Sequence, residues 1–495
     1  MSSDPLNLDA SGEWAGLWWL PEDPGHRVPG VLRYEPDCGL TLSLIGAFED
    51  RVTTTPTPGV LIVHEGRRTW GVIHGAADQR EISLFGCFPN SSQRTFGARV
   101  KTPDKQTVVA TTALIGAHIG GEDEAAFSTT EVSVEELGHW AASTVFEGFL
   151  SAPDGRPDGS GSISVKPVEV QSAEVDGTVF SLAHRHTLPF FDQRRGETVG
   201  RMVDTSYIKI TRRDKASSLI DAIGYARLIQ DLISLATHRA VGVIWIRLKL
   251  ASNENTSGSR GLRPERNVDV LHSPSVVGKG DAKAATHHHV FFTCEALPFE
   301  KVMPRWCDMH ERLQSATNMV LGLRYAPARY VENNLLTAVG AAEVLHRGFD
   351  IDEPPIPSRD FKPMREAMLA QVPVEHRERL RGLLRNDPTL RDRLYALAAR
   401  PDHEALSILV PDVDRWARRT TRARNDLAHE GRTPNHELEE LMAIVDVTTG
   451  VVILNLLNEL GLSVERQREI VRGHPKLRAT ARSAQSWLTT SKVNS

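Results

Sequence analysis

Short apolar segments alternate with turn-forming residues over about the first 125 residues of the chain. Breaks such as Asp37-Cys38-Gly39 and Thr57-Pro58-Gly59 separate segments that are long enough for single strands. Segments of this length and spacing are typical of a β-sandwich or an open barrel. The predicted strands are Val31 to Tyr34, Thr41 to Ile45, Val60 to His64, Trp70 to His74, Ile82 to Phe85, Val108 to Ala110 and Leu114 to Ile119.

The pattern becomes mixed between residues 126 and 300. Apolar residues at helical spacing predict a helix from Ser217 to Ala236, and a capping box at Ser133 to Glu136 predicts a short helix through Trp140. Residues 252–286 are rich in Ser, Asn, Gly and charge, which predicts a long mobile loop. Further strands are predicted at Ser162 to Val170, Tyr207 to Ile210 and Val241 to Leu250.

From Pro304 onward the apolar spacing becomes helical, and Pro304 suits a first helical position. Asn435 is the predicted cap of the last helix. The predicted helices cover 305–323, 328–347, 361–371, 374–386, 388–399, 412–430 and 435–460. The fold class is therefore α+β and multidomain. The domains are a β-rich region over 1–300, either in one part or in two parts divided near 125, a helical bundle over 301–462 and a basic C-terminal tail over 463–495.

Composition narrows the class of protein without identifying it. The net charge of −5 does not by itself indicate nucleic-acid binding, so any basic surface must be local. The four cysteines form no CxxC pair, which argues against a zinc site of standard spacing and against a disulfide scaffold. No signal pattern is present, and the most apolar helix, near Val451 to Leu457, is short for a membrane span. We therefore expect a cytoplasmic protein without membrane partner, metal or other cofactor.

The predicted helix over 412–430 ends in residues suited to phosphodiester chemistry. Asn425 and His429 lie one turn apart on one face of that helix, and Arg424 directly precedes Asn425. Gly431 is a good helix terminator, so His429 falls in the last turn, where the helix dipole favours a cation. A fixed cation beside a histidine that can gain or lose a proton suits catalysis on a phosphodiester.

The spacing from arginine to histidine is not specific by itself. It recurs at Arg68 to His74, Arg305 to His310 and Arg468 to His474, and with the asparagine at Arg266-Asn267 to His272. Context distinguishes Arg424, which has a helix before it, a terminating glycine after it and a second apolar helix following. The alternative is a solvated basic helix end with an incidental histidine.

The stretch from Arg424 to His429 resembles the Arg-x4-6-His motif of HEPN ribonucleases, and the chain around it is similar to their ApeA-like anti-phage members. The segments Gly16 to Pro21, Gly30 to Leu32 and Leu40 to Leu42 resemble the start of the N-terminal domain that accompanies them. The resemblance implies an endoribonuclease that acts by abortive infection on translation RNA such as tRNA. It also implies that a phage-derived trigger is sensed by the N-terminal region.

RNA cleavage needs no metal, because the 2′-hydroxyl can attack the adjacent phosphorus. In such a reaction His429 would act as general base or acid, Arg424 would hold the phosphate oxygens and Asn425 would orient either group. Glu343 could face this centre, or it could be solvated or capping. The competing class is a non-catalytic ligand-binding β-domain fused to a helical interaction module.

Two geometric features extend this hypothesis. Arg415, Arg418, Arg419 and Arg422 recur at i, i+3, i+4 and i+7, so they form a stripe that either contacts RNA phosphates or pairs with acids as a solvated face. Ideal helical geometry places Arg424 and His429 about 140° apart. Two copies of the motif meeting across a two-fold axis would bring the residues together, which predicts a homodimer through the helical domain. The resemblance implies the same composite site.

Overall fold

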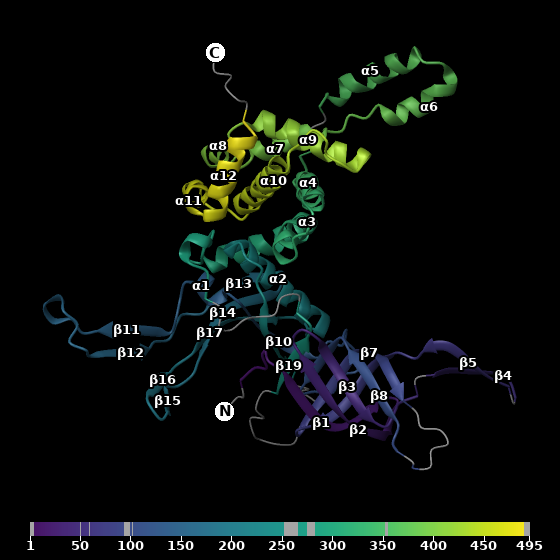
Figure 1. Ribbon diagram of the computed structural model, residues 1–495, viewed down its shortest axis with the longest axis vertical. Coiled ribbons are helices and arrows are strands. Elements are labelled where there is room, and N and C mark those ends of the chain that lie inside the picture. The colour runs from purple at the N-terminus through teal and green to yellow at the C-terminus, as the bar shows by residue number, and fades with distance from the viewer. Residues whose placement is uncertain are drawn as a thin grey trace. The chain divides into compact units, whose positions relative to one another are not determined.

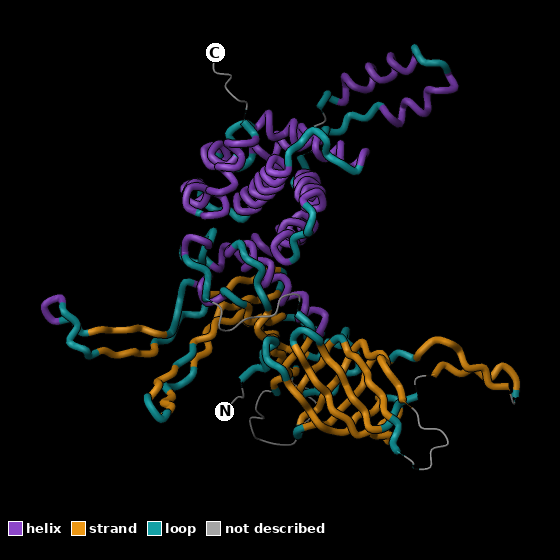
Figure 2. The backbone as a smooth tube through the Cα atoms, in the orientation of Figure 1, coloured by secondary structure: helices purple, strands orange, loops and turns teal. Residues whose placement is uncertain are grey.

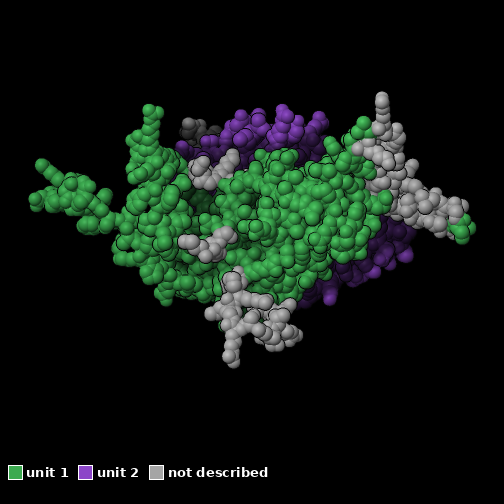
Figure 3. Space-filling view, turned by 90° about the horizontal axis from the view of Figure 1, so that it is seen from below, with its two compact units in different colours: residues 1–236, 240–285, 292–304 green, residues 237–239, 286–291, 305–495 purple. Residues whose placement is uncertain are grey.

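The computed structural model describes residues 4–49, 51–58, 60–93, 100, 102–251, 266–274, 283–351 and 355–489. Two compact units divide the chain (Figure 3). The first unit comprises residues 1–236, 240–285 and 292–304, and the second comprises residues 237–239, 286–291 and 305–495. The first is rich in β-structure and the second is helical, which confirms the predicted fold class.

A six-stranded antiparallel barrel forms part of the first unit (Figures 1 and 2). Its strands are β1 (Gly12–Leu20), β2 (Asp23–Glu35), β3 (Gly39–Ile45), β6 (Trp70–Ala77), β7 (Arg80–Gln93) and β8 (Lys105–Ala110). Pairing of β7 with β8 closes the ring. Alternate residues of each strand point inward, and Trp18, Leu32, Ile73 and Leu84 are fully buried there.

The same sheet continues beyond the barrel as an open antiparallel sheet. Its strands, in spatial order, are β9 (Thr112–Ile115), β19 (Asn267–His272), β18 (Val243–Leu250), β10 (Phe127–Val134), β17 (Asp204–Arg212), β14 (Thr178–His186) and β13 (Gln171–Val175). Helix α2 (Leu219–Thr237) packs on it through an edge-to-face contact between Tyr225 and Phe180. Helix α1 (Leu137–Ala141) follows β10.

Separate two-stranded hairpins extend from the first unit (Figure 2). They are β4 (Arg51–Thr57) with β5 (Val60–Arg67), β11 (Phe146–Leu150) with β12 (Gly161–Val165), and β15 (Phe190–Gln193) with β16 (Thr198–Arg201). Short 3₁₀ turns occur at Pro153–Gly155 and His287–His289. The hairpins β11–β12 and β15–β16 expose large apolar side chains, including Phe149, Ile163, Phe190 and Phe191.

Two predictions for the first unit are wrong. Ser133 lies within β10 and its hydroxyl donates to the carbonyl of Ser206 (2.9 Å), so it caps no helix. The predicted loop over 252–286 contains strand β19, which pairs with β18 and β9. The rest of the prediction falls partly on residues 252–265 and 275–282, which lie outside the described residues.

Helices follow from residue 299 to 487. They are α3 (Phe299–Tyr325), α4 (Val331–Gly348), α5 (Ser358–Ala370), α6 (Val374–Leu383), α7 (Leu390–Ala399), α8 (His403–Leu409), α9 (Val413–Glu430), α10 (Leu438–Glu459), α11 (Val464–Gly473) and α12 (Pro475–Trp487). Helix α10 packs along α4 and also contacts α7, α8, α9, α11 and α12. Pro304 lies inside α3, which begins at Phe299, six residues before the predicted start at residue 305.

The apolar run near Val451 to Leu457 belongs to α10, which has 22 residues. The expectation that this helix is too short for a membrane is therefore wrong on length, because α10 has the length and composition of a span. Most of the helix is buried inside the helical unit, however. Its position in the core accounts for its apolar composition.

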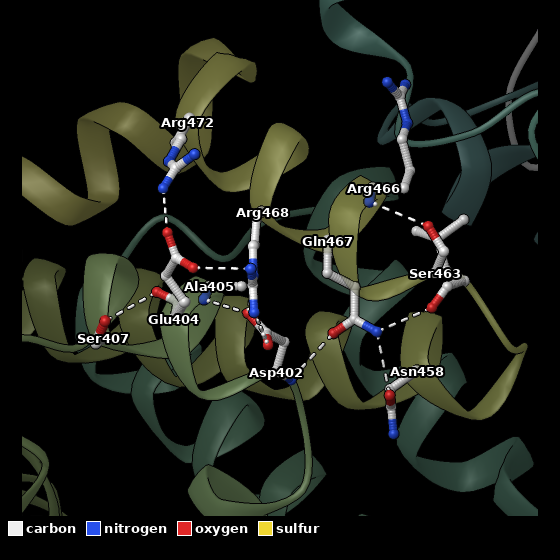
Figure 4. Close-up of polar contacts among 11 residues, drawn as sticks. Asp402, Glu404, Ala405, Ser407, Asn458, Ser463, Arg466, Gln467, Arg468 and Arg472 are labelled. Atoms are coloured by element: carbon white, nitrogen blue, oxygen red, sulfur yellow. Dashed lines mark hydrogen bonds and ion pairs between the residues drawn. The ribbon is translucent and has the colours of Figure 1, made fainter.

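Residues 464–487, predicted as part of a basic tail, form α11 and α12. Ion pairs join α11 to the start of α8 (Figure 4). Arg468 contacts Asp402 (2.8 Å), and Arg472 contacts Glu404. Several tail cations therefore serve packing between helices, and buried residues such as Leu477 fix α12 on the unit.

Candidate functional site

Helix α9 carries the predicted site, and its ends are well defined. The side chain of Asp412 accepts from the backbone N–H of Arg415 (2.8 Å), which caps the first turn. Gly431 ends the helix with φ 67°, and its N–H donates to the carbonyl of Leu427 (3.0 Å). The predicted terminator is thereby confirmed, and His429 lies in the last turn. Buried Trp416 and Ala423 anchor the helix.

Arg424 is held by a carboxylate on a neighbouring helix. Its guanidinium lies 3.5 Å from the carboxylate of Glu343 on α4. Glu343 also lies 3.7 Å from Arg347 and is only 18% exposed. A further contact of 3.4 Å joins the Arg424 guanidinium to the Asn425 amide oxygen. The structure therefore brings Arg424, Asn425 and Glu343 together, with Arg424 still partly accessible.

His429 is exposed at the end of α9. Within the part of the chain that the structure describes, its ring makes no hydrogen bond or ion pair. The imidazole nitrogens are thus available to an incoming ligand. One chain does not bring His429 against Arg424, because the two positions face directions about 140° apart on the helix.

The arginine stripe pairs largely with acids. Arg418 lies 3.0 Å from Asp414, and Arg422 lies 3.9 Å from Asp426. Arg419 differs from these two, because it forms a two-pronged contact with the buried carboxylate of Glu440 on α10. The Nε of Arg415 is buried without a hydrogen-bond partner among the described residues. The side chains of Arg418 and Arg422 are more than half exposed, so they remain accessible to a polyanion.

Two groups near this site were not singled out by the sequence. Arg347 shares Glu343 with Arg424, and its i+4 spacing from Glu343 on α4 is the signal that could have found it. The ring of His436 contacts the carbonyl of Arg419 (3.2 Å) in the connection between α9 and α10. Burial, together with the nearby Arg419 cation, lowers the pKa of His436. Asn435, the predicted cap, instead donates to Asp426 (3.2 Å), and Glu437 occupies the N-cap position of α10.

The other arginine-to-histidine pairs lie in surroundings that differ from those of Arg424 and His429. Asn267 and His272 lie on strand β19 rather than on a helix. Arg305 lies within α3 rather than at its start, and donates to the carbonyl of Leu460 (3.0 Å). In the fourth pair, Arg468 forms an ion pair with Asp402 and His474 is buried. The context that distinguished Arg424 in the sequence therefore also distinguishes it in the structure.

Metal-ligand chemistry has no evident location in the described ranges, where no cluster of three or more His, Cys, Asp or Glu side chains could hold an ion. His287, His288 and His289 occupy a 3₁₀ turn in which the first two are exposed and His289 is half-buried. The expected independence from cofactors stays a prediction.

Comparison with known protein families finds a match for the β-rich N-terminal region and another for the helical region. A family model for the ApeA N-terminal domain 1 matches residues 13–306, and a model for the Apea-like HEPN domain matches residues 336–466. The second match includes Glu343, Arg424, Asn425 and His429. No curated protein and no solved structure gives a significant match.

Proposed function

Because the chain belongs to the family that combines the ApeA N-terminal domain 1 with an Apea-like HEPN domain, we propose that it is an anti-phage endoribonuclease whose active site contains Arg424 and His429. The HEPN domain implies a ribonuclease, and hence an RNA substrate. The observation that carries the proposal is the imidazole of His429, which is exposed at the end of α9, one turn from Asn425, and has no partner among the residues that the structure describes.

The proposed reaction is attack by a ribose 2′-hydroxyl on the adjacent phosphorus. The O–P bond to the 2′-oxygen forms as the bond to the 5′-oxygen breaks. His429 removes the 2′-proton or protonates the leaving 5′-oxygen, and its exposure leaves both ring nitrogens free for these roles. The products carry a 2′,3′-cyclic phosphate and a 5′-hydroxyl. No metal takes part in this sequence of steps.

Arg424 would stabilise the negative charge that builds on the phosphate. Glu343 would position its guanidinium from α4, and the pair is long enough at 3.5 Å for the guanidinium to turn toward a phosphate. Asn425 would orient either the phosphate or the ring of His429, with which it shares a helix face. The exposed Arg418 and Arg422 would contact neighbouring phosphates, whereas Arg419 is committed to Glu440.

The wider proposal concerns the biological setting. Two chains would pair through their helical units, so that Arg424 of one faces His429 of the other. The substrate would be RNA of the translation machinery, in particular tRNA, cleaved in the cytoplasm. Such cleavage would stop protein synthesis and abort infection. The N-terminal unit would sense a phage-derived trigger and release the activity.

The direct test is to incubate the purified full-length protein with total RNA and to sequence the new 5′ ends. We expect discrete new ends that carry a 5′-hydroxyl and form equally in the presence of a chelator. Ends with a 5′-phosphate, or cleavage that requires a divalent ion, would contradict the mechanism. A complete lack of cleavage with and without phage extract would favour a non-catalytic binding protein.

A further inference from the structure

A serine, a histidine and an aspartate form a hydrogen-bonded chain within the first unit. The hydroxyl oxygen of Ser143 lies 3.0 Å from Nε2 of His184. On the other side of the ring, Nδ1 of His184 lies 3.1 and 3.2 Å from the two carboxylate oxygens of Asp204. The side chains of His184 and Asp204 are only 5% and 9% exposed. This is the order of contacts found in serine hydrolases, where the triad is defined by geometry and not by sequence position.

The fold explains why these residues meet. Strands β14 and β17 are antiparallel, with His184 directly opposite Ser206. Asp204 lies two residues before Ser206 and therefore on the same face of the sheet. Helix α1 lies beside β17, and its C-cap Ala142 has φ 53°, which turns the chain so that Ser143 reaches the imidazole.

The contacts indicate which ring nitrogen of His184 faces a hydrogen-bond acceptor. An ionised carboxylate only accepts hydrogen bonds, so Nδ1 of His184 must carry the proton that it shares with Asp204. When the ring is neutral, Nε2 is then an acceptor, and the Ser143 hydroxyl can donate to it. Asp204 is fixed in turn by the hydroxyl of Thr144 (2.9 Å) and the N–H of Val145 (3.1 Å). His184 is thus oriented as a general base toward Ser143.

Candidate donors for a developing oxyanion adjoin the serine in the chain. Among the residues that the structure describes, the backbone N–H groups of Ser143 and Thr144 donate to no protein acceptor. Free N–H groups at the nucleophile and at the residue after it are the donors that stabilise the tetrahedral intermediate of acyl transfer.

An apolar groove of about 690 Å³ is lined in part by residues that are close in sequence to Ser143 and Asp204. Its lining includes Phe146, Ile163, Phe190, Phe191 and Met202, which come from the hairpins β11–β12 and β15–β16 and from the residue that follows β16. Phe146 directly follows the Val145 that contacts Asp204, and Met202 precedes Asp204 by two residues. The exposed apolar side chains of these hairpins would be covered by an apolar group attached to the reacting carbonyl.

We propose that Ser143, His184 and Asp204 form a second catalytic site, which hydrolyses a carboxylic ester with an apolar acyl group. Ser143 Oγ bonds to the acyl carbon while His184 Nε2 takes the serine proton. The acyl–oxygen bond to the alcohol then breaks, and the alcohol leaves with the proton from His184. Water repeats the sequence on the acyl-serine, which releases the carboxylic acid and restores the hydroxyl. This activity does not depend on the proposed RNA cleavage.

The test uses the full-length protein and an alkyl fluorophosphonate, which reacts with activated serines as the Oγ–P bond forms and the P–F bond breaks. Intact-mass measurement and peptide mapping would report the adduct. We expect one adduct per chain, on Ser143, and measurable hydrolysis of p-nitrophenyl butyrate. Wild-type protein without an adduct on Ser143 would overturn the proposal.

Variants separate catalysis from a merely structural hydrogen-bond network. Labelling should disappear in Ser143→Ala and slow at least about 100-fold in His184→Gln and in Asp204→Asn, which loses the carboxylate that fixes the ring tautomer. The matched control is Ser151→Ala, because Ser151 bonds to Asp158 (2.7 Å) and, among the described residues, makes no hydrogen bond to a histidine. Its labelling should equal that of the wild type. Unchanged labelling of Ser143 in either His184→Gln or Asp204→Asn, with melting curves showing a folded protein, would equally overturn the proposal.

Discussion

At the scale of single residues, burial decides what each histidine of the helical unit can do. His429 is exposed and free to exchange a proton with solvent or substrate. His474 and His238 are packed against Phe291, with ring centroids 4.8 Å from that of Phe291 in both cases. Burial, more than the nearby Arg324, lowers the pKa of His474 to about 4 and lowers that of His238 well below its ordinary value. The sequence shows histidines but not their burial, so it could not separate these roles.

These buried rings predict acid sensitivity of the helical unit. The unfolded chain protonates His474 near its ordinary pKa of about 6.5, whereas the folded chain resists protonation until about pH 4. Stability is therefore fully present above about pH 6.5 and is lost as the pH falls, by about 3 kcal/mol from this residue at pH 4. His474→Asn keeps an N-cap for α12 but does not titrate. Thermal melting between pH 7 and pH 4 should show a shallower pH dependence in this variant; an unchanged dependence would contradict the assignment.

At the scale of elements, the helices and strands that could be predicted are those whose sequence signals lie within the element itself or directly beside it. Helix α9 was predicted at 412–430 and spans Val413–Glu430, because its buried stripe and its terminating glycine are adjacent in the sequence. Strand β19 was missed, since Asp269 suggests a solvated loop although it is buried and paired with Arg247 (2.8 Å). The caps predicted at Ser133 and Asn435 failed for the same reason. Each side chain bonds to a residue outside the predicted helix, Ser133 to Ser206 and Asn435 to Asp426, instead of capping that helix.

Two arginines of the stripe on α9 are expected to differ in how much they contribute to the stability of the helical unit. Arg419 compensates Glu440, which is 5% exposed, so Arg419→Ala leaves a buried carboxylate without its cation. We expect a loss of about 3 kcal/mol in the free energy of unfolding. Arg418→Ala removes only an exposed pair with Asp414 and should cost less than about 1 kcal/mol. Chemical denaturation compares the two variants. Equal stabilities would show that Arg419 is as peripheral as Arg418.

At the scale of the whole molecule, a β-rich unit and a helical unit carry two different constellations of reactive side chains. The family match covers both units, but one chain holds Arg424 toward α4 and leaves His429 exposed on another face of α9. The helix that carries Arg424 and His429 was predicted from the sequence and is confirmed, whereas the catalytic role of the two residues stays a prediction. The sequence could not give the pairing of Arg424 with Glu343, because that contact joins positions 81 residues apart (424 minus 343) through helix packing.

The composite site makes a prediction for mixed assemblies. Arg424→Ala and His429→Ala are each expected to be inactive. If each site takes Arg424 from one chain and His429 from the other, a mixed dimer keeps one intact site. Random co-assembly should then restore about a quarter of the wild-type activity. No restoration after verified exchange of subunits would remove the shared site, and a fully active monomer by light scattering would remove the dimer.

The central claim is that His429 performs RNA cleavage, and a comparison of cleavage rates tests it most directly. Wild type, His429→Ala and His376→Ala would be assayed on total RNA, with His376 as the control because it is also an exposed helical histidine. Melting temperatures should agree among the three proteins, since neither ring is buried. We predict that His429→Ala loses at least about 100-fold in rate while His376→Ala cleaves like the wild type. Cleavage by His429→Ala at the wild-type rate would contradict the account.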